Sequence, residues 1–225
     1  MRPIRYAFSF SILLLWAAAC STATEQPIPR FVALEFEAEG INAPITQNSD
    51  TLRVSEVKFL STRFRIIDQD SLILQSSERI EPFLFRYDET FESPFLSLDI
   101  QLQFDDVAPI IGYEMEQRPL RQGDPVLDDE FRGTDETFSL IFKGRINRRS
   151  FIYQTGLSFD KSVELEPVQL TDNAETLLIS KSIDLEAIFT NPEGGFYSPD
   201  SDEDMQMVEQ AFEQQLQISA EALAR

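Results

Sequence analysis

Alternation of apolar and polar residues dominates the chain beyond about residue 30. Between Leu96 and Asp105 every second residue is Leu, Ile or Phe, and the residues between them are Ser, Asp or Gln. Successive side chains of a strand point to opposite faces, so this segment predicts a strand with one face in a core and the other in water. Weaker alternation predicts further strands in segments 32–38, 52–59, 64–74, 111–115, 138–146, 151–159, 163–170 and 177–185. Together the segments predict about nine to eleven strands.

Polar turns separate these segments. Residues 68–70 (Asp-Gln-Asp) predict one hairpin turn, and residues 147–150 (Asn-Arg-Arg-Ser) predict another. The apolar parity shifts near Ser55, which predicts a β-bulge or a break in that strand. The sequence has neither the spacing of βαβ units nor an internal repeat. We therefore expect a mainly β fold, an antiparallel β-sandwich or a distorted barrel.

The apolar period changes near the C-terminus, where we expect one α-helix over about residues 202–223. Ser201 is placed to cap this helix, and the acidic run 202–204 falls in its first turn, where the helix dipole favours negative charge. Apolar residues then recur at three- and four-residue spacing: Met205, Val208, Phe212, Leu216, Ala220 and Leu223. Such a stripe predicts a helix that packs on the sheet or, as the alternative, on a partner helix.

Residues 1–19 have the layout of a cleaved secretory signal peptide. Arg2 and Arg5 supply positive charge, residues 6–16 form an apolar core, and residues 17–19 are three alanines that suit a signal peptidase. The apolar run is too short for a transmembrane helix. We therefore expect export of the chain from the cytoplasm.

Cys20, the only cysteine, follows the signal directly. The segment resembles a lipobox, which bacterial lipoproteins carry before their lipidated cysteine, although Ala17 stands where Leu is usual. The resemblance implies that Cys20 receives acyl chains, palmitate among them, and becomes the first mature residue. The alternative is an ordinary A-x-A cleavage site, which leaves a free thiol on a secreted protein.

These signals divide the chain into a lipoprotein signal peptide (1–19), a lipidated tether (20–30) and a folded β domain (31–225). The tether is polar and contains Pro27 and Pro29. Ser21 follows the cysteine in place of Asp, which by resemblance to lipoprotein sorting in double-membrane bacteria favours the outer membrane. We expect a lipid anchor in the outer membrane, with the domain on the periplasmic or the cell-surface face.

Charge and composition exclude several functions. The chain has 19 Lys and Arg against 39 Asp and Glu, a net charge of −20. An acidic surface argues against nucleic-acid binding, which needs Lys and Arg, and against electrostatic docking on anionic lipid. The chain has no histidine, which excludes Ser-His-Asp and Cys-His nucleophiles and His-ligated zinc or copper sites. We expect no cofactor.

A long loop over residues 117–135 is the first candidate binding site. Loops of this length are usually functional or mobile. The loop mixes basic and acidic residues, and its candidate binding residues are Arg118, Arg121, Asp128, Asp129 and Arg132. A mobile insertion at a sheet edge is the alternative.

A Ca²⁺ site is the second candidate, with carboxylates at alternate positions as at the start of a calcium loop: Asp200, Asp202 and Asp204. Met205 stands where an EF-hand has Gly, and Ala211 stands where it has a bidentate Glu, so an EF-hand is excluded. An irregular Ca²⁺ site and simple helix capping are the two interpretations left.

Two further activities have weaker support. The adjacent acids at 105–106 suit a carboxylate-based hydrolase in principle, but neighbouring strand residues face opposite sides. A carbohydrate-binding surface would depend on Tyr and Phe, because Trp16, the only Trp, leaves with the signal. We therefore expect a protein that is not an enzyme and has a binding or structural role, with an envelope protein as a candidate partner.

The last third of the chain carries a resemblance to a protein group. From Phe138 onward, the turn NRRSF between two strands, the charged strand VELEP and the segment IDLEAIFTNPEGGFYSP before a helix resemble uncharacterised bacterial surface lipoproteins with β-sandwich domains. Some of these are distantly similar to the periplasmic copper-handling proteins that accompany methanobactin. The resemblance implies an extracytoplasmic β-sandwich. Copper binding is not carried over, because the histidines that it would favour are absent.

Overall fold

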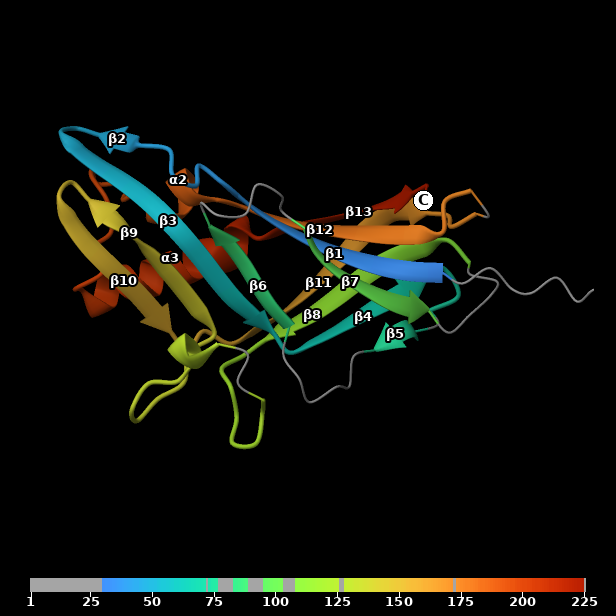
Figure 1. Ribbon diagram of the computed structural model, residues 1–225. Coiled ribbons are helices and arrows are strands. Elements are labelled where there is room, and N and C mark those ends of the chain that lie inside the picture. The colour runs from blue at the N-terminus through green and yellow to red at the C-terminus, as the bar shows by residue number, and fades with distance from the viewer. Residues whose placement is uncertain are drawn as a thin grey trace, which may run out of the picture.

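The computed structural model describes residues 30–71, 73–76, 83–88, 95–102, 108–125, 128–171 and 173–224. Within these ranges the chain is mainly β, and its strands form three sheets (Figure 1). The signal peptide, Cys20, the tether up to residue 29 and the acids at 105–106 lie outside the described residues, so what we predict of them stays a prediction. None of the helices in these ranges is both long and apolar enough to cross a membrane.

The elements follow one another in the order of their labels. The strands are β1 (Arg30–Glu39), β2 (Ile45–Gln47), β3 (Asp50–Ser61), β4 (Arg63–Asp68), β5 (Ile73–Ser76), β6 (Phe83–Asp88), β7 (Phe95–Leu102), β8 (Ile110–Gln117), β9 (Leu140–Ile146), β10 (Arg149–Thr155), β11 (Phe159–Val168), β12 (Thr176–Asp184) and β13 (Gln217–Leu223). The helical elements are a 3₁₀ turn η1 (Asp129–Phe131), α2 (Leu185–Phe189) and α3 (Asp202–Gln215).

The three sheets are joined by direct strand-to-strand connections. Sheet A has the order β13-β12-β1-β7, and sheet C has the order β11-β8-β4-β5. Sheet B has the order β10-β9-β3-β2, and β6 also pairs with β3. The chain passes from sheet B to sheet C twice, from β3 into β4 across Thr62 and from β10 into β11 across residues 156–158. Sheets A and C overlap at one end of the molecule, and sheet B extends to the other end with α3 behind it (Figure 1).

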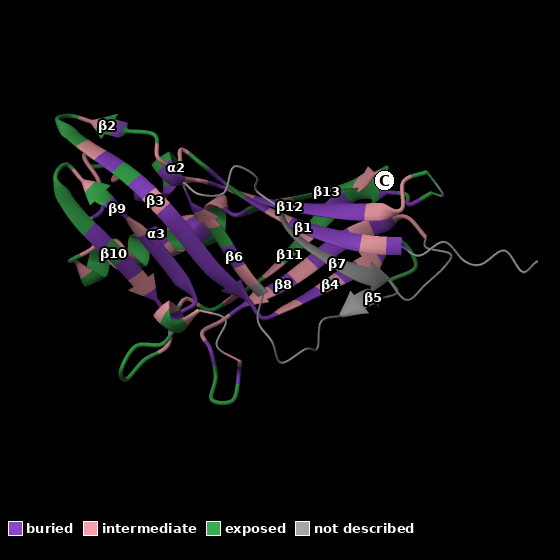
Figure 2. Cartoon of the chain, viewed as in Figure 1, coloured by how far each residue is buried: buried purple, intermediate pink, exposed green. Residues whose placement is uncertain are grey.

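One hydrophobic core joins all three sheets and both helices. Phe212 of α3 packs on the inner face of sheet B, with its ring centroid 5.7 Å from that of Phe59 and 6.0 Å from that of Phe142. Phe36 of sheet A contacts Phe59 edge-on at 4.8 Å, which joins sheets A and B. The burial colours of Figure 2 follow this core along β3, β1 and β12. Aromatic side chains supply much of the buried area, and their edge-to-face contacts add to it.

The structure confirms the predicted β-sandwich and its local features. A hairpin joins β4 to β5 around residues 68–70, where the Asp70 N–H donates to Asp68 Oδ1 at 3.0 Å. A second hairpin joins β9 to β10, and Asn147 in its turn has a φ of 57°. The register of β3 against β9 shifts between Val54 and Glu56, which is the bulge predicted at Ser55.

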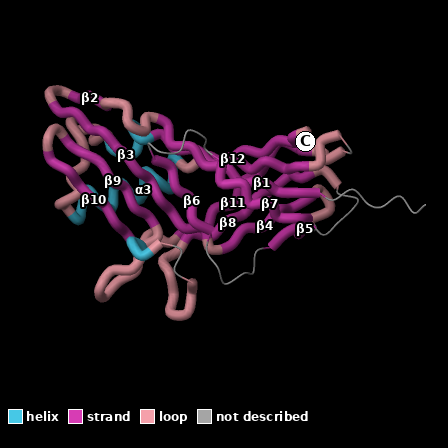
Figure 3. The backbone as a smooth tube through the Cα atoms, in the orientation of Figure 1, coloured by secondary structure: helices cyan, strands magenta, loops and turns pink. Residues whose placement is uncertain are grey.

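The C-terminal helix begins where predicted but is shorter than predicted. Ser201 caps α3, which ends at Gln215, and Leu216 already has an extended backbone. Residues 217–223 form β13 on the edge of β12 (Figure 3). Ile218, Ala220 and Ala222 alternate with polar residues, so this segment also fits the period of a strand. Pairing with the open edge of β12 favours the strand over the helix, because it satisfies the backbone N–H and C=O groups on the facing edges of both strands.

One pair of strands departs from the predicted antiparallel arrangement. β1 pairs in parallel with β12, from the Phe31–Thr176 pair to the Glu39–Asp184 pair. The two strands are far apart in sequence, and a parallel pair needs a long connection, which the rest of the chain supplies.

Candidate functional site

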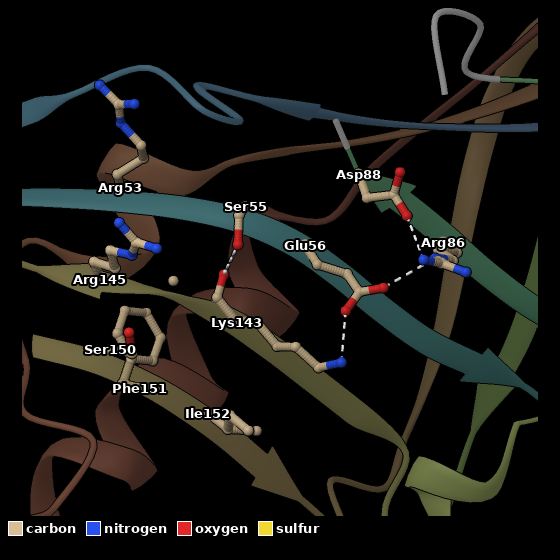
Figure 4. A pocket seen from close by; sticks show the side chains of 11 residues that line it. Arg53, Ser55, Glu56, Arg86, Asp88, Lys143, Arg145, Ser150, Phe151 and Ile152 are labelled. Atoms are coloured by element: carbon tan, nitrogen blue, oxygen red, sulfur yellow. Dashed lines mark hydrogen bonds and ion pairs between the residues drawn. The ribbon is translucent and has the colours of Figure 1, made fainter. Parts of the chain in front are cut away.

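A hollow of about 560 Å³ lies on the outer face of sheet B, over β3, β9, β10 and β6 (Figure 4). Most of its side chains come from strand positions that face away from the core. The lining side chains are Arg53, Ser55, Glu56, Arg86, Asp88, Lys143, Arg145, Ser150, Phe151 and Ile152, and Gly144 completes the lining.

The bulge in β3 shapes this hollow. Val54 and Val57 both point into the core, and the two residues between them are displaced to the outer face. Ser55 Oγ donates to the Lys143 carbonyl oxygen at 3.2 Å, which fixes the bulge against β9. Gly144 lies opposite, where an added Cβ would collide with the Arg53 carbonyl oxygen. Glycine therefore permits the close approach of β3 and β9 at the floor of the hollow.

One end of the hollow is a network of ion pairs. Glu56 is nearly buried and accepts from Lys143 at 2.7 Å and from Arg86 at 2.9 Å. Arg86 also pairs with Asp88 of the same strand (Figure 4). Lys58 lies 3.5 Å from Glu56 and extends the network beyond the hollow.

The network continues into the loop that follows β8. Lys58 donates to Asp128 at 2.6 Å and also to Glu130, and Lys143 pairs with Glu130 as well. Burial alone would lower the pKa of Lys58, but the hydrogen bonds to Asp128 and Glu130 outweigh it and raise that pKa above the ordinary value. Burial alone would raise the pKa values of Asp128 and Glu130, but their lysine partners hold them below the ordinary values. These groups therefore stay charged at neutral pH, which suits a structural tie and not proton transfer.

The other end of the hollow carries positive charge without a counter-charge. Arg53 of β3 and Arg145 of β9 are directly opposite each other in the register, and both are exposed. Neither makes an ion pair with any residue in the part of the chain that the structure describes. Arg148, in the turn between β9 and β10, is also exposed and has no ion pair within the described ranges. Among the described residues these three arginines have no acidic partner, although the net charge of the chain is −20.

Like charges directly opposite each other on a sheet destabilise it. A guanidinium presents a rigid fork of donors that matches a carboxylate, phosphate or sulfate group. The Arg53–Arg145 pair therefore has the chemistry of an anion-binding site. Ile152, on the neighbouring strand β10, is 61% exposed and supplies an apolar surface in the same hollow.

Comparisons with protein-family models, curated proteins and solved structures found no match.

A second hollow, of about 810 Å³, borders the first. It lies beside the β9–β10 turn and the segment 196–200, and its lining includes Phe196, Pro199 and Asp200. The two hollows share residues 150–152, so β10 separates one from the other. Arg149 pairs with Asp200 at 2.9 Å across the second hollow.

The predicted binding loop is held against the protein by its own charges. Arg118 donates to Asp124 at 2.8 Å, and Arg132 donates to the Asp124 carbonyl oxygen at 2.9 Å. Asp128 binds Lys58, and its other oxygen accepts from the Glu130 N–H, which caps η1. Beneath the loop lies a small hydrophobic cluster: Leu60, Leu120, Phe131, Phe138 and Ile141.

Two of the predicted loop residues have looser surroundings. Asp129 lies in the first turn of η1, and the side chain of Arg121 is 70% exposed, at 4.0 Å from Glu116. Arg118 and Arg132 therefore bind within the loop, and Asp128 binds it to β3. None of the five candidates lines either of the two hollows described above.

The predicted Ca²⁺ ligands also have separate roles. Asp200 pairs with Arg149, Asp204 accepts from the Ser198 N–H at 2.8 Å, and Asp202 lies in the first turn of α3. No group of three or more acidic residues in the described ranges is arranged to hold a metal ion. The contacts agree with helix capping.

Sequence reasoning missed the arginine site. Its signal was present, because Arg53 alternates with the apolar residues Leu52 and Val54, and Arg145 lies between Gly144 and Ile146. Both patterns place a basic residue on the outer face of a strand. What the pattern did not show is that β3 and β9 are neighbours in a register that sets the two residues opposite each other.

Proposed function

We propose that this chain is a lipid-anchored, extracytoplasmic binding protein that holds an anionic group on the outer face of sheet B. The observation that carries the proposal is the Arg53–Arg145 pair, exposed and without an ion pair in the described ranges, at one end of a hollow of about 560 Å³. The export signal and the lipobox-like segment before Cys20 support the location.

A binding role agrees with the charge network better than catalysis does. The carboxylates of the network already bind lysine or arginine, and the chain has no histidine to serve as a base at neutral pH. The network instead keeps the bulge and the neighbouring strands in one geometry. Such support by neighbouring contacts is what a preorganised binding site needs.

The test measures binding of defined anions to the full-length protein in detergent micelles by isothermal titration calorimetry. The probes are inorganic phosphate, sulfate, galacturonate oligomers and short glutamate oligomers. We expect at least one probe to bind, and we expect the double variant Arg53→Gln/Arg145→Gln to bind it at least about ten-fold more weakly. A hydrogen bond to a charged group contributes about 1.5–3 kcal/mol, and about 1.4 kcal/mol corresponds to a factor of ten.

The matched control is Arg63→Gln/Arg65→Gln on sheet C, which removes the same charge. Arg65 lies 3.4 Å from Glu114, and Arg63 lies 3.8 Å from Glu116, so these two arginines already have acidic partners. Absence of binding by every probe, or an equal loss in the control, would contradict the proposal.

A further inference from the structure

The edge of sheet B next to the arginine site is open. β10 is the last strand of the sheet and pairs only with β9 among the described strands (Figure 1). A two-residue turn makes Ile146 and Arg149 a hydrogen-bonded pair. Because such pairs alternate along the strand, the backbone N–H and C=O groups of Ser150, Ile152 and Gln154 are directed away from β9. No backbone hydrogen bond from these groups to another part of the described chain is present.

Beyond its first residue, Arg149, which pairs with Asp200, this edge lacks the usual protection against pairing with another chain. Residues 150–155 (Ser-Phe-Ile-Tyr-Gln-Thr) contain no charge and no proline, and they favour the strand conformation. Natural sheets commonly protect an edge with a charge, a proline or a covering segment. Here the central residue of the edge, Ile152, is 61% exposed.

The two hollows lie on either side of this strand. The hollow of about 560 Å³ covers the outer face over β3, β9 and β10, and the hollow of about 810 Å³ lies between β10 and the segment 196–200. Both are lined by residues 150–152. A peptide added beside β10 would direct alternate side chains to opposite faces, so each hollow can receive one of its two sets.

The charge beside the edge selects the kind of peptide. Arg148 lies in the turn at one end of β10, and Arg145 lies on the adjacent strand, facing the outer hollow. An added strand would lie about 10 Å from β9, a span that a glutamate and an arginine side chain bridge together. A second copy of this chain bound by the same edge would present the uncharged residues 150–155 of its own β10, which supply no carboxylate to Arg145 and Arg148.

We propose that the open edge of β10 binds an extended acidic segment of a partner protein as an added strand, with its carboxylates toward Arg145 and Arg148. This inference rests on the proposed anion site and names the partner of that site. The backbone of β10 supplies main-chain hydrogen bonds, and the arginines supply the preference for acidic side chains.

The experiment measures the affinity of the full-length protein in detergent micelles for an eight-residue peptide of alternating Glu and Val with blocked ends. Fluorescence anisotropy is the readout. We expect this peptide to bind, and we expect the matched peptide of alternating Lys and Val to bind at least about ten-fold more weakly. The peptide methylated on every second backbone nitrogen, on the edge that would face β10, should also bind at least about ten-fold more weakly.

Variants of β10 test the edge from the side of the protein. Ile152→Pro removes an N–H that is directed away from β9, so we expect it to retain the fold and lose at least about ten-fold in affinity. Ile152→Thr keeps the backbone donor and is the matched control, with affinity within about two-fold of the unmodified protein. The methylated peptide decides the question even when Ile152→Pro does not fold.

Strand addition is overturned when the acidic peptide does not bind, or when the methylated peptide binds as well as the parent. A third outcome separates the two proposals. If Arg53→Gln/Arg145→Gln loses small-anion binding and the methylated peptide binds as well as its parent, strand addition is overturned and the anion site is supported. A second copy of the chain is the occupant of the edge if three results hold: the protein self-associates, Ile152→Pro abolishes the self-association, and the acidic peptide does not bind. Failure of every small anion to bind would contradict the proposed function itself.

Discussion

A buried lysine is the most unusual single residue of the core. Lys181 of β12 is fully buried, with its Nζ 4.3 Å from the ring centroid of Phe85 and 4.9 Å from that of Tyr113. Neither Lys181 Nζ nor the Tyr113 hydroxyl has a hydrogen-bond partner among the described residues. Burial lowers the pKa of Lys181 to about 7, because the charged form loses its hydration. The two rings offset only part of that cost.

We predict that Lys181→Met stabilises the protein, and that the gain is larger at pH 6 than at pH 9. The pKa of a lysine in the unfolded chain is about 10.4, well above the folded value of about 7. Below the folded value both states carry the proton, and the buried charge destabilises the fold in full. Between the two values the folded state has lost the proton and the unfolded state keeps it, so stability of the unsubstituted protein rises with pH.

Urea unfolding at pH 6 and pH 9 measures this difference. Each pH unit between the two pKa values corresponds to about 1.4 kcal/mol, so a gain of a few kcal/mol is expected at pH 6. Lys161→Met is the control, because Lys161 is only partly buried and its Nζ donates to the Glu213 carbonyl oxygen. Its effect should differ much less between the two pH values. An unsubstituted protein whose stability is flat between pH 6 and pH 9 would contradict the prediction.

Lys181 also shows what the pattern of a single strand can and cannot predict. It occupies the same alternate position as Leu177, Ile179 and Ile183, so the sequence itself places it on the core face of β12. The two rings that contact it come from β6 and β8, in the other two sheets. Its environment therefore depends on how the sheets pack, which the period of one strand does not contain.

At the scale of elements, the loop between β8 and β9 is held by ionic contacts to sheet B. Lys58 is buried and binds both Asp128 and Glu130. The small hydrophobic cluster around Phe131 covers the other side of the loop. The described part of the loop thus supports the outer face of sheet B.

We predict that Lys58→Met loosens this loop while the sheets stay folded. Removal of the lysine leaves Asp128 and Glu130 without their shared partner, so trypsin should cleave after Arg121 or Arg132 about ten-fold faster. Lys161→Met, on β11, is the control and should leave the cleavage rate unchanged. Unchanged cleavage in Lys58→Met would show that the hydrophobic cluster alone holds the loop.

The same contacts give the loop a dependence on acid. The pKa values of Asp128 and Glu130 are lowered in the folded state. Their contribution to the stability of the loop is therefore complete above their ordinary pKa values of about 4, and it is lost as the pH falls through the lowered values. The loop in Lys58→Met should keep only the part of this acid dependence that comes from the ion pair between Lys143 and Glu130.

Elements of the fold were predictable where the local sequence fits only one kind of structure. The hairpin at 68–70, the bulge at Ser55 and the start of α3 all have local signals, and all three are confirmed. Residues 217–223 fit two periods, and the pairing of β13 with β12 decides between them. The parallel pairing of β1 with β12 joins distant segments, and no local pattern specifies it.

At the scale of the whole molecule, the basic site contrasts with the acidic composition of the chain. The chain is strongly acidic, yet Arg53, Arg145 and Arg148, which make no ion pair within the described ranges, lie at one end of sheet B. Composition predicted the acidic surface, but the basic site needs β3, β9 and the β9–β10 turn side by side. An anion that approaches this site is attracted only at short range, because salt screens charges beyond about 10 Å at an ionic strength of about 0.1 M.

The proposed membrane anchor of this site depends on lipidation of Cys20. We predict that the full chain, expressed in a double-membrane bacterium, sediments with the membranes and is extracted by detergent but not by high salt. Acyl chains contribute about 0.8 kcal/mol for each buried CH₂, so more than one chain gives a stable anchor. Cys20→Ala should move the exported protein to the soluble fraction.

Ala17→Leu is the matched control, because it brings the segment closer to a usual lipobox and should keep the protein on the membrane. Mass spectrometry of the N-terminal peptide then separates the two processing routes. Acylated Cys20 as the first residue supports the lipid anchor. A free Cys20 thiol on a protein that is soluble without substitution would mean that residues 17–19 are an ordinary signal peptidase site, and the binding domain would then act as a secreted protein without an anchor.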